Sequence, residues 1–512
     1  MKKRQWMTMV LAVAVLAATL ASPALADRKG KKKEGGDAIA SHPNDLKYPK
    51  LKFTVPEAKD YRHELSNGIP VYIVEDHALP LVDISIMLRI GSFLEQTDEG
   101  LKQGVAPFTG TLMRQGGAGG KTAEEFDEAV DFLGTNMGSF TGSTQGGASM
   151  NCTTMVLGDS LDLFFDMLKT PGFEQERLDI RTDELIENMK QRNDDAQNIT
   201  GREWNWLMRG ESHFSSRAST VGSVSAITRD DLIAFHKKYW TPSTMMIAIS
   251  GDVKPEEILK ELEARFEGWE AVQVDVPWPP PAPSYTPKPG VYHVEKDIPQ
   301  GRVRIGHLGA QRTDWADPDL FALQVMNDVL GGGGFTSRLV KRIRSDEGLA
   351  YSAGSGFGIG DYWPGVFMML YQSKSETVAF AAQIAVAEMK LIRDEPISES
   401  ELDTAKASFI DTFPGRFDSP QALAGTFMDD EYMGRPADYW RKYQDRMRAV
   451  SVADIQRVAK KYLDPEQLVF LIVGKWDEIE PGDADGRASM KEFFGGASTE
   501  LPLRDPLTLK PM

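Results

Sequence analysis

The sequence predicts an α+β protein made of two duplicated lobes, and three observations lead to this fold class. The chain has 512 residues, which is more than a single hydrophobic core organises. Patterns typical of strands and of helices alternate along it, and one helix–strand unit occurs twice. The domains we expect are lobes at 45–275 and 291–480, a Pro-rich linker at 276–290 and a tail at 481–512.

The first lobe opens with a predicted β-hairpin. In His63–Val74 an Asn-Gly pair separates two apolar runs, which is a strong hairpin signal. Leu81–Leu88 alternates apolar and polar residues, as a half-buried strand does. Thr122 and Glu125 have the spacing of a capping box that begins a helix. Further elements are expected as strands within Ser139–Leu157 and as helices at Leu161–Leu168 and Gln175–Arg192.

The end of the first lobe returns near the end of the chain. Thr228–Tyr239 is typical of a helix and Met245–Val253 of a strand. Ser451–Tyr462 and Leu468–Gly474 repeat this unit, with every matched residue 223 positions later and no gap. Such a match indicates an internal duplication. Between the two copies we expect a strand at Tyr362–Tyr371 and helices at Ser375–Arg393 and Glu399–Phe413.

Charge and the amino-terminal pattern bound the partners and the compartment. The formal net charge is −17, and because the first 33 residues carry eight positive side chains and one negative, the remainder carries −24. Such a surface repels phosphate backbones, which argues against nucleic acid as a partner. Residues 1–26 have a basic start, an apolar run and Ala24-Leu25-Ala26, which together predict a signal peptide cleaved after Ala26.

The apolar run of that leader is shorter than the roughly 20 residues that a membrane span needs. We therefore expect an exported protein, in a bacterial periplasm, without a stable membrane anchor. The basic segment 27–44 is expected to be a disordered linker. Cys152 is the only cysteine, so no intrachain disulfide is possible, and its apolar surroundings favour a buried strand residue.

The stretch Gly104–Gly117 follows the predicted strand and a Gly91-Ser92 loop. This layout resembles the zinc-peptidase family of insulinase, pitrilysin and the mitochondrial processing peptidase, in which a helix at this place carries His-x-x-Glu-His. The resemblance puts the first His on Pro107, the catalytic Glu on Gly110 and the second His on Thr111. Pro and Gly are poor interior helix residues, so we expect this helix to be bent or shortened.

The zinc ligands of the family are therefore missing. The resemblance places the distal ligand on Asn188, with Glu187 one step away, and a single Glu cannot hold zinc alone. No two of the seven histidines lie three to five residues apart, which excludes a local histidine metal motif. We expect no metal and no other cofactor in this chain.

The second half keeps a different part of the family pattern. Gly332–Leu339 and Arg344–Tyr351 resemble its Gly-Gly-Gly-x-Ser-Ser-Arg-Leu and Leu-Arg-x-x-x-Gly-Leu-Ala-Tyr-Ser motifs. The resemblance implies that Arg344 and Tyr351 bind substrate near the scissile carbonyl, at the zinc site of an opposing lobe. The simpler interpretation is a surface ion pair of Arg344 with Asp346 or Glu347, and a core position for Tyr351.

The resemblance also implies the architecture and the role. Each lobe is expected to be a mixed, largely antiparallel sheet covered by helices. The chain is expected to be the non-catalytic subunit of a heterodimer or heterotetramer, in which a same-fold partner holds zinc and extended peptides are the substrates. One alternative is a catalytically dead peptide-binding or scaffolding pseudo-peptidase. Another is altered chemistry around Thr109, Thr111 and Asn188, where the sequence offers no nearby base or nucleophile activator.

Overall fold

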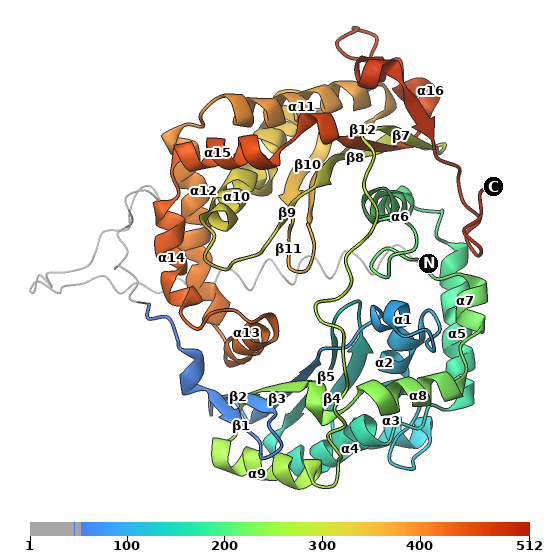
Figure 1. The fold of residues 1–512 in the computed structure, drawn as a ribbon, viewed down its shortest axis with the longest axis vertical. Coiled ribbons are helices and arrows are strands. Elements are labelled where there is room, and N and C mark those ends of the chain that lie inside the picture. Colours follow the sequence, from blue (N-terminus) through green and yellow to red (C-terminus); the bar gives the residue numbers. More distant parts are fainter. Residues whose placement is uncertain (1–45, 47–52) are drawn as a thin grey trace, which may run out of the picture. The chain divides into compact units, whose positions relative to one another are not determined.

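Two six-stranded sheets form the framework of the computed structural model, which describes Leu46 and residues 53–512 (Figure 1). The first sheet has the order β1-β2-β6-β3-β5-β4, in which β2 and β6 run parallel and all other neighbours antiparallel. Its strands are β1 (Arg62–Glu64), β2 (Pro70–Glu75), β3 (Leu81–Leu88), β4 (Asn136–Thr141), β5 (Gly146–Thr153) and β6 (Met245–Gly251).

The second sheet repeats this topology. Its order, β10-β12-β8-β13-β7-β14, matches the first sheet strand for strand when read from the β14 end, and β7 and β13 form the equivalent parallel pair. The sheets differ at one edge, where β1 is antiparallel to its neighbour and β14 is parallel. Its strands are β7 (Gly290–Glu295), β8 (Gln300–Leu308), β10 (Ala350–Phe357), β12 (Val366–Lys374), β13 (Val469–Gly474) and β14 (Ser498–Glu500).

Helices cover both sheets, so the predicted α+β class and the mixed, largely antiparallel sheets are confirmed. A short parallel pair, β9 (Ala310–Gln311) and β11 (Ile359–Gly360), lies beside the second sheet. The helices of the first half are α1 (Leu94–Thr97), α2 (Val105–Gln115), α3 (Ala123–Phe132), α4 (Leu157–Lys169), α5 (Gln175–Lys190), α6 (Ala196–Arg209), α7 (Val221–Ser225), α8 (Arg229–Tyr239) and α9 (Pro255–Phe266). Those of the second half are α10 (Pro318–Asn327), α11 (Val378–Asp394), α12 (Glu399–Thr412), α13 (Pro420–Met433), α14 (Tyr439–Ala449), α15 (Val452–Tyr462) and α16 (Trp476–Ile479).

Local sequence signals form the elements that they predict. The turn between β1 and β2 contains Gly68 at a φ of 87°, a left-handed conformation that glycine adopts without strain. Thr122 and Glu125 form both hydrogen bonds of a capping box at the start of α3. The repeated helices α8 and α15 begin with capping boxes as well, formed by Thr228 and Ser451 with the carboxylates three residues later.

The duplication extends to individual contacts. At the end of α8, Tyr239 donates a hydrogen bond to Asp98 at 2.8 Å and Lys238 lies 2.6 Å from the same carboxylate. At the end of α15, Tyr462 and Lys461 bind Asp319 in the same way, at 3.0 and 2.8 Å. Each lobe therefore fastens its repeated helix to one carboxylate through a Lys-Tyr pair.

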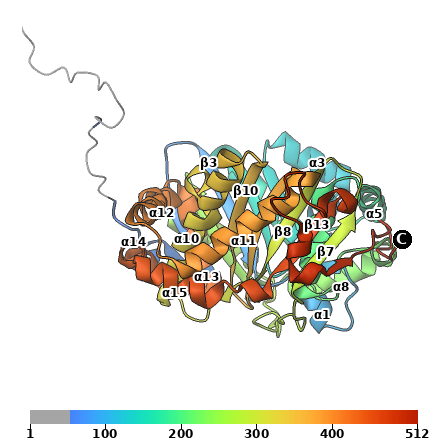
Figure 2. The ribbon, with the colours of Figure 1, turned by 90° about the horizontal axis from the view of Figure 1, so that it is seen from above.

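The two halves exchange a helix. α6 follows from the first half but packs on β8 and β13 of the second sheet (Figure 1). Its residues Ile199, Trp204 and Met208 bury against one face of β13. The β13 side chains concerned, Val469, Leu471 and Val473, are two residues apart and so point to the same side. The second sheet also contacts α11, which runs across β8 and β12 (Figure 2).

The reciprocal contact is made by α13, the counterpart of α6 in the second half. It packs on β2 and β6 of the first sheet. Phe427 lies against Tyr61 and Tyr72, with ring centroids 5.8 and 6.2 Å apart, and Tyr72 donates to Glu431 at 2.5 Å. Because each sheet is covered by a helix of the other half, residues 54–512 form one compact unit.

Some expectations lie outside the described residues, namely the signal peptide at 1–26 and the basic linker at 27–44. In the described part of the chain, no helix is both long and apolar enough to cross a membrane. The residues set apart as a tail, 481–512, contain β14, the sixth strand of the second sheet. Cys152 is buried and forms no disulfide.

Candidate functional site

α2 occupies the place of the expected zinc-binding helix. It is a continuous helix from Val105 to Gln115, so the prediction of a bent or shortened helix is wrong. Pro107 is the third residue of α2, where its missing N–H removes no intrahelical hydrogen bond. The helix therefore accommodates Pro107 without interruption.

The start of α2 is held by a buried carboxylate from α1. Glu95 accepts hydrogen bonds from the backbone N–H of Gly104 and of Ala106, both at 2.9 Å, and Arg217 lies 2.7 Å from it. Burial raises the pKa of Glu95, although these three donors oppose the shift. A negative charge here favours the helix because it faces the free N–H groups of the first turn.

Gly110 lies where α2 touches the backbone of β4. A Cβ atom at this position would lie 2.1 Å from the Thr141 nitrogen and 2.4 Å from the Phe140 carbonyl carbon. Ser139 donates a hydrogen bond to the Gly110 carbonyl at 2.6 Å and fixes this close approach. The position of the family's catalytic Glu therefore has no space for any side chain.

The other expected zinc positions carry no ligand either. Pro107 is exposed and Thr111 is half-buried on α2, and Asn188 is exposed on α5, which packs against α2. Glu187 is paired with Lys190. Among the described residues, no three His, Cys, Asp or Glu side chains are placed to hold a metal ion. The residues present do not fit a zinc ion.

Thr109 was one of the residues considered for altered chemistry. Its side chain is fully buried, and its hydroxyl donates to the Val105 carbonyl of the preceding turn at 2.8 Å. A hydroxyl in this position has no access to solvent and no adjacent base. The structure therefore gives this alternative no support.

The second half places Arg344 and Tyr351 together at the surface. The guanidinium carbon of Arg344 lies 4.6 Å from the centroid of the Tyr351 ring and 4.6 Å from that of Phe335. Tyr351 is 84% exposed and Phe335 is 70% exposed. Tyr351 is thus not a core residue, contrary to the simpler interpretation.

Arg344 is held by rings rather than by carboxylates. Its neighbours Asp346 and Glu347 pair with Arg342 and Arg487. In the part of the chain that the structure describes, Arg344 has no ion pair and no hydrogen bond from its guanidinium. Stacking occupies the faces of the guanidinium and leaves its in-plane N–H groups available to an acceptor.

The local backbone explains how the two residues meet. Arg344 lies in a π-helical turn, Val340–Asp346, and Tyr351 is the second residue of the edge strand β10. Gly348, at a φ of 63°, supports the turn between them. π-helical turns are rare in proteins, and those that occur are often located at functional sites.

Arg338, the arginine of the Gly-rich motif, has a structural role instead. Arg338 binds Glu401 of α12 through two hydrogen bonds, of 2.6 and 3.1 Å. Burial opposes ionisation of Glu401, but Arg338 and Ser398 outweigh it and lower the pKa of Glu401 to about 2. The pair fastens the Gly-rich turn to the helical layer.

Sequence reasoning did not identify Phe335 or Glu95 as site residues. Phe335 occupies the variable position of the Gly-Gly-Gly-x motif, where a large aromatic residue directly after four glycines was a usable signal. Glu95 was not detectable, because its contacts with Gly104 and Arg217 depend on how the loop before α2 folds back.

Comparison with known proteins finds relatives of similar sequence and similar fold. The family model described as the peptidase M16 inactive domain matches residues 226–409. An uncharacterized zinc protease of Streptomyces coelicolor is 26% identical over 242 residues, which cover 45% of this chain and 51% of that protein. The chain thus spans about half the length of that relative.

Two further relatives align over most of the chain. A probable mitochondrial-processing peptidase subunit beta of Arabidopsis thaliana is 22% identical over 462 residues, covering 86% of this chain and 81% of that protein. The non-peptidase homolog YmxG of Helicobacter pylori is 23% identical over 413 residues, covering 79% and 91%. A solved peptidase M16 inactive domain from Pseudomonas fluorescens has the same fold, with a TM-score of 0.70 and 23% identity over 81% of this chain and 97% of its own.

Proposed function

We propose that this chain, which matches the family model of the peptidase M16 inactive domain over residues 226–409, is the non-catalytic partner subunit of a zinc endopeptidase. It contributes Arg344 and Tyr351 to a same-fold subunit whose helix carries His-x-x-Glu-His. The carrying observation is the half-buried Arg344, stacked on the exposed Tyr351 with its N–H groups free of carboxylate partners among the described residues. The closed position at Gly110 supports a division of labour between two chains.

The chemistry of the two residues fits a role in binding the transition state. Guanidinium and phenol groups donate hydrogen bonds, and donors aimed at a developing oxyanion stabilise it. Neither group activates water at neutral pH. The water, the zinc ion and the general base are therefore assigned to the partner subunit.

The setting of this reaction is also part of the proposal. The subunit is exported to a bacterial periplasm after cleavage behind Ala26, and it assembles there as a heterodimer or heterotetramer. Extended peptides are the substrates. The Arabidopsis relative, a processing-peptidase subunit by name, is an example of a subunit with this fold.

Reconstitution tests the proposal directly. We expect the purified chain to bind no stoichiometric zinc and to cleave no peptide, and a co-expressed His-x-x-Glu-His subunit to become active in its presence. In that complex, Arg344→Ala should lower kcat/KM about 10²–10³-fold, the range found for removing one oxyanion donor. Arg342→Ala is the matched control, because Arg342 pairs with Asp346 and Glu388 and should leave activity unchanged. Full activity of the Arg344→Ala complex would refute the proposal.

A second candidate function is a peptide-binding or scaffolding pseudo-peptidase that serves no active site. The H. pylori relative, named a non-peptidase homolog, favours it. Co-purification separates the two functions. A scaffold would be recovered as a homodimer, or with a protein that lacks His-x-x-Glu-His.

A further inference from the structure

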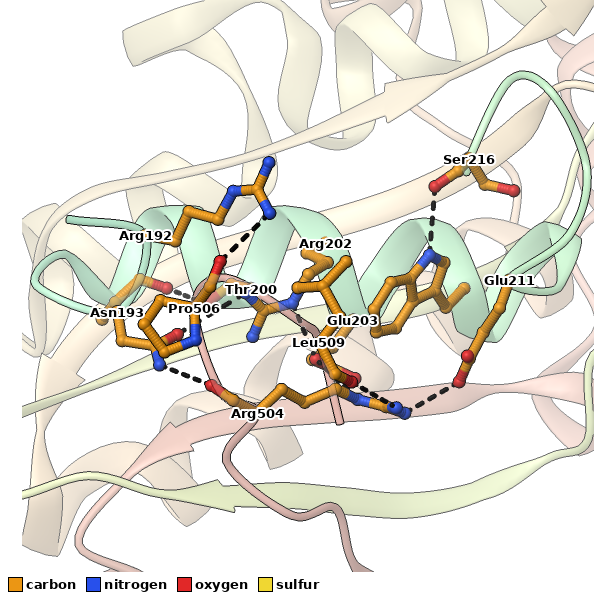
Figure 3. A network of polar contacts seen from close by, with 12 residues as sticks. Arg192, Asn193, Thr200, Arg202, Glu203, Glu211, Ser216, Arg504, Pro506 and Leu509 are labelled. Atoms are coloured by element: carbon orange, nitrogen blue, oxygen red, sulfur yellow. Dashed lines mark hydrogen bonds and ion pairs between the residues drawn. The ribbon is translucent and has the colours of Figure 1, made fainter. Parts of the chain in front are cut away.

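A cavity of about 410 Å³ lies where five segments of the chain meet. It is lined by Gln96 of α1, the end of α6, the loop that follows α6, the Pro-rich connector and the C-terminal segment. Figure 3 shows this segment along α6, with Arg504 reaching Glu203 and Glu211. The cavity has the size of a small-ligand site and is remote in sequence from Arg344 and Tyr351.

The two carboxylates that line this cavity, Glu203 and Glu211, are already paired with arginines. Glu203 lies 3.0 Å from Arg202 and 3.7 Å from Arg504, and Glu211 lies 2.8 Å from Arg504. Arg504 also stacks on Trp206, with its guanidinium carbon 4.6 Å from the ring centroid. Arg209 also lines the cavity, but in the described structure no ion pair joins it to either carboxylate.

Arg209 is therefore the lining arginine that has no carboxylate partner among the described residues. It is half-buried, its Nε is buried without a hydrogen-bond partner, and within the described residues it forms no ion pair. Burial lowers its pKa, with no carboxylate opposing the shift. Its place in the last turn of α6 suits a cation but provides none of its N–H groups with an acceptor.

The remaining lining groups define what the cavity accepts. His213 is fully engaged, because its Nε2 donates to the Pro281 carbonyl at 2.9 Å and its Nδ1 accepts from Ser215 at 2.7 Å. Trp206, Tyr285 and Leu501 supply apolar surface beside Arg209. The combination suits a single carboxylate attached to an apolar group.

We propose that this cavity binds a monocarboxylate with an apolar body, with Arg209 as the carboxylate-binding residue. Two sources have this chemistry, namely a free carboxylic acid and the C-terminal residue of a peptide. The carboxylate would replace the solvent around the guanidinium edge, and the apolar body would lie against Tyr285 and Leu501. This site is independent of the proposed partner-subunit role.

Binding of N-acetylphenylalanine to the full-length protein tests the proposal, with N-acetylphenylalaninamide as the uncharged control. We expect saturable binding of the acid by calorimetry, at least about tenfold weaker binding of the amide, and weakening with salt. A tripeptide ending in a free phenylalanine distinguishes the sources, since tighter binding of the peptide indicates a peptide C-terminus and equal binding a free acid.

Two variants locate the site. Arg209→Gln should weaken binding of the acid about tenfold or more, whereas Arg181→Gln, a change at a half-buried arginine of α5 that does not line the cavity, should not. If Arg209→Gln fails to fold, Ser284→Trp is the second variant. The tryptophan fills the cavity from the exposed connector and should abolish binding of the acid. Equal affinity for acid and amide, unchanged binding by the Ser284→Trp protein, or no saturable binding at millimolar concentration would overturn the proposal.

Discussion

At Gly110 the backbone of β4 takes up the volume that a side chain on α2 would need. A helix interior ordinarily gains about 1 kcal/mol when Gly is replaced by Ala. Here the added methyl group meets the Thr141 nitrogen at 2.1 Å and the Phe140 carbonyl carbon at 2.4 Å. Both are backbone atoms, which cannot rotate away as a side chain could. Overpacking against a fixed backbone outweighs the gain in helix propensity.

We therefore expect Gly110→Ala to lower the free energy of unfolding by about 1–3 kcal/mol, measured by urea denaturation. Gly138→Ala on β4 is the matched control, because a Cβ atom there meets nothing within 4 Å, and it should change the free energy by less than about 0.5 kcal/mol. Equal stability of the two variants would contradict the packing argument. The same geometry predicts that restoring His-x-x-Glu-His by substitution alone creates no zinc site.

At the scale of elements, the Arg338–Glu401 pair connects the Gly-rich turn with α12. The pKa of Glu401 is about 2 in the folded protein, below the ordinary value of 4.5. The pair therefore stabilises the fold fully above about pH 4.5, and this stabilisation is lost as the pH falls toward 2.

Arg338→Met should remove this pH dependence. We compare the free energy of unfolding, from urea denaturation, at neutral pH and near pH 3. Between these two pH values the wild type should lose about 1–3 kcal/mol more of this free energy than the variant, after allowance for solvent screening. Arg441→Met serves as the control, since the exposed Arg441–Glu57 pair contributes little. Parallel pH curves for wild type and Arg338→Met would show that the pair does not stabilise the fold.

At the scale of the whole molecule, the exchange of α6 and α13 makes each sheet dependent on the other half. Trp204 is 3% exposed and buries against Val469 and Leu471 of the second sheet, although it belongs to the first half. Loss of such a side chain typically costs about 3–5 kcal/mol. Because the contact joins the halves, this cost falls on both lobes together.

Trp204→Ala should lower the stability of both lobes in a single unfolding transition, recorded by circular dichroism and tryptophan fluorescence together. Asn205→Ala, on the exposed face of the same helix, should have little effect. Two separate transitions, of which only one shifts, would mean that the lobes unfold independently.

Sequence reasoning predicted what depends on local pattern and repetition. The hairpin, the capping boxes and the duplicated α8–β6 and α15–β13 units follow from turn residues and from matched spacing. The helix exchange does not, because an amphipathic pattern in α6 shows that one face is buried but not which sheet buries it. The closed position at Gly110 was equally out of reach, since it depends on how near β4 approaches.

The exchange of helices also sets an order of events during synthesis. The last strand of the first sheet is complete at Gly251, but the helix that covers this sheet, α13, is complete only at Met433. At about 5–20 residues per second, the ribosome needs roughly ten seconds or more to add the missing part. A nascent first lobe therefore waits with an uncovered apolar face, and a chaperone that delays folding until the chain is complete would protect it from aggregation.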